Sequence, residues 1–88
     1  MITQMTIPKM DKAMRLLVLL ERQPMSGVQL AKVAGLGRAT VVRLVTDLRE
    51  LGCKVDSERT EGRDFAYTLR DWGVFDSARV KRYVKARL

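Results

Sequence analysis

The sequence predicts one mainly α-helical domain with a small β-hairpin. Before residue 52, apolar residues recur at helical spacing in three segments. Two short segments after residue 52 alternate apolar and polar residues, as half-buried strands do. A last helical pattern follows them. The 88 residues suit a single domain, and 47% apolar with 31% charged residues is typical of a folded globular protein.

The first helical pattern begins near Pro8, after an N-terminal arm of residues 1–7, because proline suits the first turn of a helix. Gln23-Pro24 ends it, since the residue before a proline is pushed out of helical geometry. Val18 and Leu19 point away from the core stripe, which indicates a second neighbour for this helix or a partner subunit. The expected stripe is Met10, Ala13, Met14, Leu17 and Leu20, with Leu16 beside it.

The second helix is bounded by two local signals. Ser26 and Gln29 have the spacing of a capping box, so the helix should begin after Ser26. It should run to about Ala34, because Gly35 suits the left-handed conformation that closes helices.

The third helix is expected over 38–51. Gly37 is an acceptable N-cap residue and Gly52 ends the pattern. Its apolar face consists of Val41, Leu44, Val45, Leu48 and Leu51.

Four residues of these two helices have the spacing of a helix-turn-helix. Ala31 supplies a small side chain where the second helix must cross closely, and Gly35 supplies the turn four positions later. Val41 and Leu44 follow as buried apolar residues on the next helix. A plain helical bundle with a hairpin is the alternative, but it does not require all four residues in register.

The hairpin is expected to have strands Cys53–Glu58 and Phe65–Leu69, joined by a polar turn over 59–62. Asp76 then caps a basic last helix, 77–88. The apolar stripe of this helix is Val80, Tyr83, Val84 and Leu88.

The composition excludes several kinds of chemistry. The chain has no histidine, and its single cysteine, Cys53, cannot form an internal disulfide. We therefore expect no metal site, no cofactor, no small-molecule ligand and no enzymatic activity. Cys53 is interpreted as a small apolar residue. The longest apolar run, Leu16–Leu20, is far too short to span a membrane, and residues 1–7 do not resemble a signal peptide, so we expect a cytoplasmic protein.

The net charge of +7 and the pI near 10.2 favour a polyanionic partner. Residues 1–52 carry eight basic and four acidic side chains, and residues 77–88 carry five basic and none acidic. The segment between them, 53–76, is slightly acidic, with four basic and six acidic side chains. Positive charge is therefore concentrated at both ends of the chain.

The stretch LERQPMSGVQLAKVAGLGRATVVRLVTDLRELGCKV resembles the N-terminal DNA-binding domains of bacterial winged helix-turn-helix regulators of the IclR, DeoR and BirA types. The resemblance extends over roughly Met10 to Leu69. It implies that the helix over 38–51 is a recognition helix in the DNA major groove and that the hairpin is the wing. The protein is expected to be a repressor, and its small size is typical of regulators from phages and mobile elements.

Two features depart from that pattern. Gly37 stands where these families usually have serine or threonine, so a hydroxyl that contacts phosphate is missing. No sensing or catalytic domain follows the motif in this sequence, so no effector response is inferred.

Helical rotation identifies the residues of the third helix that face away from its core side. The N-terminal part of a recognition helix enters the groove most deeply. Arg43 is expected to bind guanine or a phosphate, and Val42 to contact a thymine methyl group or to pack at the edge of the core. Thr40 and Arg38 are expected to contact phosphates. The same face continues with Arg49 and Glu50, but the residues expected to contact bases are Arg38, Ala39, Val42, Arg43 and Thr46.

Two more surfaces leave alternatives open. Arg59 and Arg63 flank the hairpin turn and are expected to reach DNA, although the acidic residues around them also suit a solvated hairpin. The last helix is expected to form a homodimer that places two recognition helices one DNA turn apart, or else to pack on the first helix of its own chain. Its basic face suits either the DNA backbone or solvent. The expected dimer contacts are Trp72, Phe75, Val80, Tyr83 and Val84.

The main rival function is a small winged-helix module that binds another protein instead of DNA. The acidic residues of the wing would suit such a use, as would the two apolar patches, one at Val18 and Leu19 and one on the last helix. Steep salt dependence of DNA affinity distinguishes a DNA-binding protein from this rival.

Overall fold

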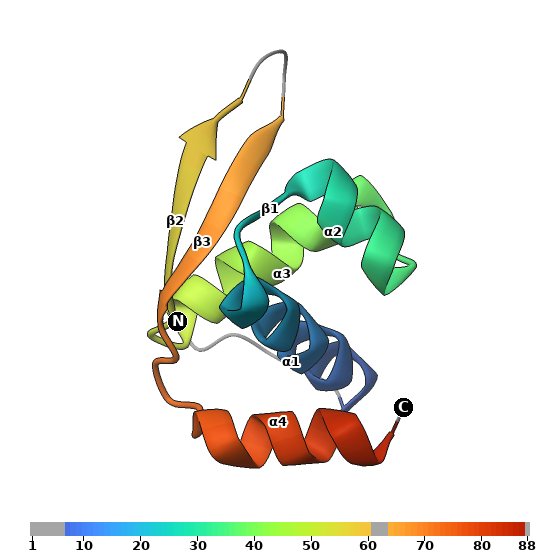
Figure 1. Ribbon diagram of the computed structural model, residues 1–88, viewed down its shortest axis with the longest axis vertical. Helices are drawn as coiled ribbons and strands as arrows, with labels where there is room; N and C mark the ends of the chain where they lie inside the picture. The colour runs from blue at the N-terminus through green and yellow to red at the C-terminus, as the bar shows by residue number, and fades with distance from the viewer. Residues whose placement is uncertain (1–6, 61–63, 88) are drawn as a thin grey trace.

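The computed structural model describes residues 7–60 and 64–87. Within these ranges the chain is a small α+β domain with four helices and a three-stranded antiparallel sheet of order β1-β3-β2 (Figure 1). The elements in chain order are α1 (Ile7–Arg22), β1 (Met25–Ser26), α2 (Gly27–Ala34), α3 (Arg38–Glu50), β2 (Lys54–Arg59), β3 (Phe65–Asp71) and α4 (Ser77–Ala86). Of the expected arm, residues 1–6 lie outside the described ranges, and Ile7 already belongs to α1.

The expected hairpin is present, but the expectation of only two strands was wrong. Strands β2 and β3 pair antiparallel, with Ser57 opposite Tyr67. The short strand β1 pairs on the other side of β3, with Met25 opposite Tyr67. A strand of two residues has no alternation to recognise, and its second residue, Ser26, has the pattern of a helix N-cap, so only the pairing with β3 reveals the strand.

The expected helix boundaries are confirmed by their caps. The Ser26 hydroxyl accepts a hydrogen bond from the Gln29 N–H at 3.1 Å, and the Gln29 side chain accepts one from the Ser26 N–H at 2.9 Å. Gly35 closes α2 in the left-handed conformation, with φ 68° and ψ 36°. The Asp76 carboxylate accepts from the Arg79 N–H at 3.0 Å at the start of α4. All four helices begin within about a residue of the expected positions, and α1, α2 and α3 also end there, whereas α4 ends at Ala86 and not at the expected residue 88. Leu88, expected on the apolar stripe of α4, lies outside the described residues.

Helix α1 is the centre of the core. It packs against α4 on one side and against α2, α3 and β3 on the other (Figure 1). Ala13, Leu16 and Leu17 are fully buried, whereas Met10 and Met14 are only partly buried. Leu16 is thus a central core residue and not a flanking one, because α1 is covered from two directions. The remaining buried apolar residues are Leu20, Leu30, Val41, Leu44, Val45, Leu48, Cys53, Val55, Tyr67, Val80 and Val84.

Packing of α4 on α1 of the same chain contradicts the dimer contacts expected at two positions. Val80 and Val84 are each only 5% exposed, so the interior of one chain already covers them. Trp72 and Phe75 are partly buried against the core. Tyr83 is also partly buried, with the Arg87 guanidinium 3.8 Å from the centre of its ring.

A close crossing of two turns was not foreseen from the sequence. Gly73 has φ 61°, and a Cβ atom there would lie 2.5 Å from the Cys53 backbone nitrogen. The adjacent Val74 N–H donates to the Leu51 carbonyl at 3.2 Å. This contact joins the segment after β3 to the end of α3.

None of the helices in the described part is both long and apolar enough to cross a bilayer.

Replacing Gly35 with valine should lower the free energy of unfolding by about 1–3 kcal/mol, because a β-branched residue resists positive φ. Space is not the obstacle, since a Cβ atom at Gly35 would have no neighbour within 4 Å. Urea denaturation measures the change. The control is Gly37→Ser, at a residue with φ −72°, which should be neutral or stabilise by a few tenths of a kcal/mol. An unchanged stability of Gly35→Val would contradict the role of the turn.

Candidate nucleic-acid interface

One side of α3 is exposed along its length. Val41, Leu44, Val45 and Leu48 are buried on the other side. Ala39, Val42, Arg43 and Thr46 are exposed, in agreement with the helical rotation. Val42 is 48% exposed, so it is not a packed edge of the core. The side of α3 that the sequence assigns to base contacts is therefore open.

Two polar residues of α3 are occupied by bonds within the fold. The Thr46 hydroxyl donates to the Val42 carbonyl at 3.1 Å. Arg49 donates two hydrogen bonds to the Val55 carbonyl, at 3.0 and 2.7 Å, and so ties β2 to α3. Arg49 holds the hairpin in place, a contact that no local sequence pattern indicates.

Asp64, immediately before β3, joins the hairpin to the two helices of the α2–turn–α3 unit. Its carboxylate accepts hydrogen bonds from the Val28 N–H at 3.1 Å and the Phe65 N–H at 2.8 Å. It also forms an ion pair of 3.4 Å with Arg38 at the start of α3. Gly27 permits this approach, because a Cβ atom there would lie 2.8 Å from the Asp64 Oδ1 atom. In the sequence Asp64 is only one of the acidic residues around the hairpin turn, whereas its contacts in the fold give it a structural role.

The electrostatics of Asp64 agree with this geometry. Burial by itself would raise the pKa of the carboxyl group, but several partners outweigh it and hold the pKa below its ordinary value. These are the N–H groups of Phe65 and Val28, the charge of Arg38 and a hydrogen bond from the Ser26 side chain. Asp64 is therefore ionised in the folded protein at neutral pH.

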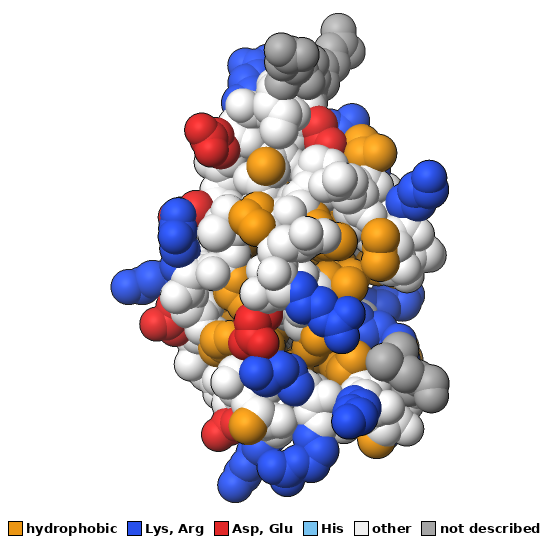
Figure 2. Space-filling model, in the orientation of Figure 1, with side chains coloured by type: hydrophobic (Ala, Val, Ile, Leu, Met, Phe, Trp, Pro, Cys, Tyr) orange, Lys and Arg blue, Asp and Glu red, His pale blue; other side chains and the backbone are white. Residues whose placement is uncertain are grey.

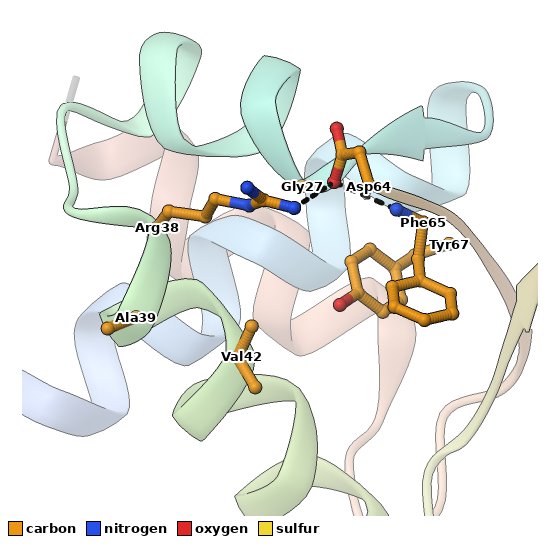
Figure 3. A pocket seen from close by; sticks show the side chains of 7 residues that line it. All are labelled: Gly27, Arg38, Ala39, Val42, Asp64, Phe65 and Tyr67. Atoms are coloured by element: carbon orange, nitrogen blue, oxygen red, sulfur yellow. Dashed lines mark hydrogen bonds and ion pairs between the residues drawn. The ribbon is translucent and has the colours of Figure 1, made fainter. Parts of the chain in front are cut away.

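A hollow of about 310 Å³ lies between the first half of α3 and the start of β3 (Figure 3). Ala39 and Val42 come from α3, and Phe65 and Tyr67 come from β3. Phe65 is 41% exposed. The hollow therefore presents apolar surface, with the Arg38–Asp64 ion pair at one end (Figure 3).

A second hollow, of about 290 Å³, lies where the start of α1 meets α3. Lys9 and Lys12 of α1 line it together with Thr40 and Arg43 of α3. Lys9 forms an ion pair of 2.7 Å with Asp47. Lys12 was missed as a candidate, because only the packing of α1 on α3 brings it beside Thr40 and Arg43.

Of the two hairpin arginines expected to contact DNA, one lies in the described part of the chain. Arg59 is the last residue of β2 and is exposed, whereas Arg63 lies outside the described residues. Asp56 pairs with Arg70 across the strands at 2.9 Å. The Thr60 N–H and hydroxyl both donate to the Asp64 carbonyl at 3.1 Å, so the two ends of the turn are held together.

Cys53 is buried, as expected for a small apolar residue. Its thiol donates to the Trp72 carbonyl at 3.2 Å. Burial, together with the negative charge of Asp71, raises the pKa of this thiol to about 11. Because the thiolate is the nucleophilic form, Cys53 is not a reactive cysteine.

Comparison of the chain with models of known families, with characterised proteins and with solved structures gave no significant match. The resemblance to winged helix-turn-helix regulators thus rests on the residues quoted for it.

The contribution of Asp64 to stability should depend on pH. Its folded-state pKa is lowered, so the contribution is present above about pH 4 and is lost as the pH falls through the folded-state value. Urea unfolding should show Asp64→Asn to be less stable than the wild type by about 1–2 kcal/mol at pH 7, with the difference shrinking toward pH 3. Asp56→Asn, at an exposed ion pair, should change the stability by less than about 0.5 kcal/mol. A difference that is constant with pH would contradict the role of the charge.

Alkylation of Cys53 by iodoacetamide should be far slower in the folded protein than in urea, because the buried thiol is protonated at pH 8. Mass spectrometry of quenched samples measures the rate. Gly35→Val should speed the reaction if it raises the unfolded population. Equal rates with and without urea would place the thiol at the surface.

Proposed function

We propose that the protein is a sequence-specific double-stranded DNA-binding regulator of the winged helix-turn-helix kind, with repression as its expected effect. In this proposal α3 is the recognition helix and the β2–β3 hairpin is the wing. The exposed side of α3 carries the proposal, since its arginine, threonine and apolar side chains are open while α2 and the hairpin hold the helix in place. Acting on DNA, such a regulator would work in the cytoplasm of a prokaryotic cell.

The exposed residues suit direct readout of bases in the major groove. Arg43 has the length and the donors for a bidentate contact with guanine, worth about 1–3 kcal/mol of discrimination. Val42 and Ala39 offer apolar contact to thymine methyl groups. Arg38 is oriented by Asp64 and Arg49 by Val55, so these two arginines position α3 and the hairpin relative to each other.

The hollow beside the start of α1 suits a backbone phosphate. Lys12 supplies a cation, Thr40 a hydroxyl donor, and Arg43 lies on the same rim. A phosphate contact there would fix the register of α3 in the groove without reading sequence. Arg59, exposed at the end of β2, would make a further contact between the wing and the DNA backbone.

The rival function, binding of a protein in place of DNA, is favoured by one feature. The hollow between α3 and β3 is apolar, with Val42 and Phe65 both exposed beside it. A pure protein-binding module would retain only weak DNA association without sequence preference.

Selection of bound duplexes from a random pool tests the proposal, with one preferred sequence as the expected result. Two-fold symmetry in the selected sequences would support the homodimer expected from the sequence, which the apolar stripe of α4 does not support. The logarithm of the binding constant for the selected duplex should fall linearly with the logarithm of the salt concentration, with a slope of about −0.9 for each phosphate contacted. No enriched sequence, together with a shallow salt slope, would favour the rival.

Substitutions separate base contacts from phosphate contacts. Arg43→Ala should weaken binding to the preferred duplex by about 5–150-fold while affecting random duplexes much less. Lys12→Ala should weaken binding to all duplexes alike and reduce the salt slope by about one contact. Lys85→Ala, at an exposed lysine of α4, is the matched control and should leave both quantities unchanged. If Arg43→Ala leaves sequence preference intact, α3 is not the reading helix.

A further inference from the structure

An apolar groove follows the side of α1 that lies between α2 and α4. It consists of two hollows, of about 220 and 380 Å³, which share Val18, Arg22 and Val84. The apolar lining is Val18, Leu19, Val33, Ala34 and Val84. Figure 2 shows hydrophobic side chains between these helices with basic side chains around them.

The apolar residues of this groove are only partly covered by the fold. Val84 is buried and forms its floor, whereas Val33 on α2 is 58% exposed. Val18 and Leu19 are partly buried, on the side of α1 that the sequence predicted to need a second neighbour. Helix α4 covers this side of α1 only in part. A single exposed valine needs no explanation, but a continuous groove from three helices marks an interaction surface.

The rim of the groove is positively charged. Arg15, Arg22, Lys81 and Lys85 line it, with Glu21 as the acidic residue among the lining side chains. Arg15 is paired with Asp11 at 2.9 Å, and Lys81 with Glu21 at 2.9 Å. Arg22 and Lys85 are exposed, and neither forms an ion pair within the described part of the chain. Two cations on an apolar groove thus remain to be matched by a partner.

We propose that this groove binds an amphipathic helix of a protein partner, with an apolar face flanked by aspartate or glutamate. An apolar groove between helices is the usual receptor for one face of an amphipathic helix. The exposed cations Arg22 and Lys85 would pair with the flanking carboxylates and select an acidic partner over a basic one.

A second copy of this chain fits the groove less well. In a two-fold symmetric contact, the basic rim of one copy faces the same basic rim of the other, which is unfavourable. The net charge of +7 adds to the repulsion. Charge complementarity therefore favours a different, acidic chain.

The groove and the exposed side of α3 are separate surfaces. Helix α3 lies behind α1 in the view of Figure 1, and no residue that lines the groove belongs to α3. A partner helix could therefore bind while α3 contacts DNA. The proposal does not rest on DNA binding, so either can fail without the other.

Selection from a displayed library of helical peptides of random composition tests the groove. The wild type should enrich peptides with apolar residues at helical spacing and flanking aspartate or glutamate. Val33→Glu should lower the affinity for the selected peptides by about tenfold or more, as loss of a central apolar contact does. The matched control is Val74→Glu, at a valine that is 72% exposed and does not line the groove.

A second pair of variants tests the charge separately from the apolar surface. Lys85→Glu should lower the affinity for the same peptides severalfold, with a larger loss at low salt. Arg82→Glu on the same helix should leave that affinity unchanged. The proposal would be overturned if the selected peptides lacked acidic residues, or if the wild type enriched no more peptides than the Val33→Glu protein. It would also be overturned if the control variants weakened peptide binding as much as the test variants. Sedimentation showing a dimer that Val33→Glu dissociates would overturn it in favour of a second copy. Unchanged DNA affinity of Val33→Glu would show that the two surfaces are independent.

Discussion

The Asp64 carboxylate fixes the arrangement on which the rest of the interface depends. It bonds to the backbone at the start of α2, to the start of β3 and to Arg38 at the start of α3. Three segments that are distant in sequence are therefore held by one charged group, which is 18% exposed. Hydrogen bonds to an ionised group are stronger than those between neutral groups, so this contact sets the position of the hairpin relative to α3. The helix N-terminus adds favourable charge for the carboxylate.

A glycine makes that contact possible. Gly27 is buried where α2 begins, and any side chain there would collide with the Asp64 carboxylate. On the other side of the hairpin, Arg49 binds the Val55 carbonyl and holds β2 to α3. The hairpin is thus anchored to α3 from both strands, and the hollow beside Val42 is a consequence of that geometry.

The packing of α1 decides which surfaces of the molecule remain available. Because α1 is covered by α4 on one side and by α2, α3 and β3 on the other, α3 buries one face against it and leaves the opposite face exposed. The coverage by α4 is incomplete, so a groove with a basic rim remains beside it. The positive charge at the two ends of the chain is thereby divided between two surfaces, one near α3 and one between α1, α2 and α4. The acidic residues of the middle segment are used largely within the fold, as at Asp64.

The sequence by itself determined the helices, their caps and the exposed side of α3, because these depend on contacts within a few residues. The Ser26 capping box, the left-handed Gly35 and the exposure of Ala39 and Arg43 all follow from local spacing. Only the tertiary structure decided which neighbour each apolar face received. Burial of Val80 against α1, the pairing of β1 with β3, the role of Asp64 and the place of Lys12 beside Thr40 all depend on residues far apart in the chain. A one-dimensional pattern shows that a face must be covered or a charge compensated, but it does not specify the partner.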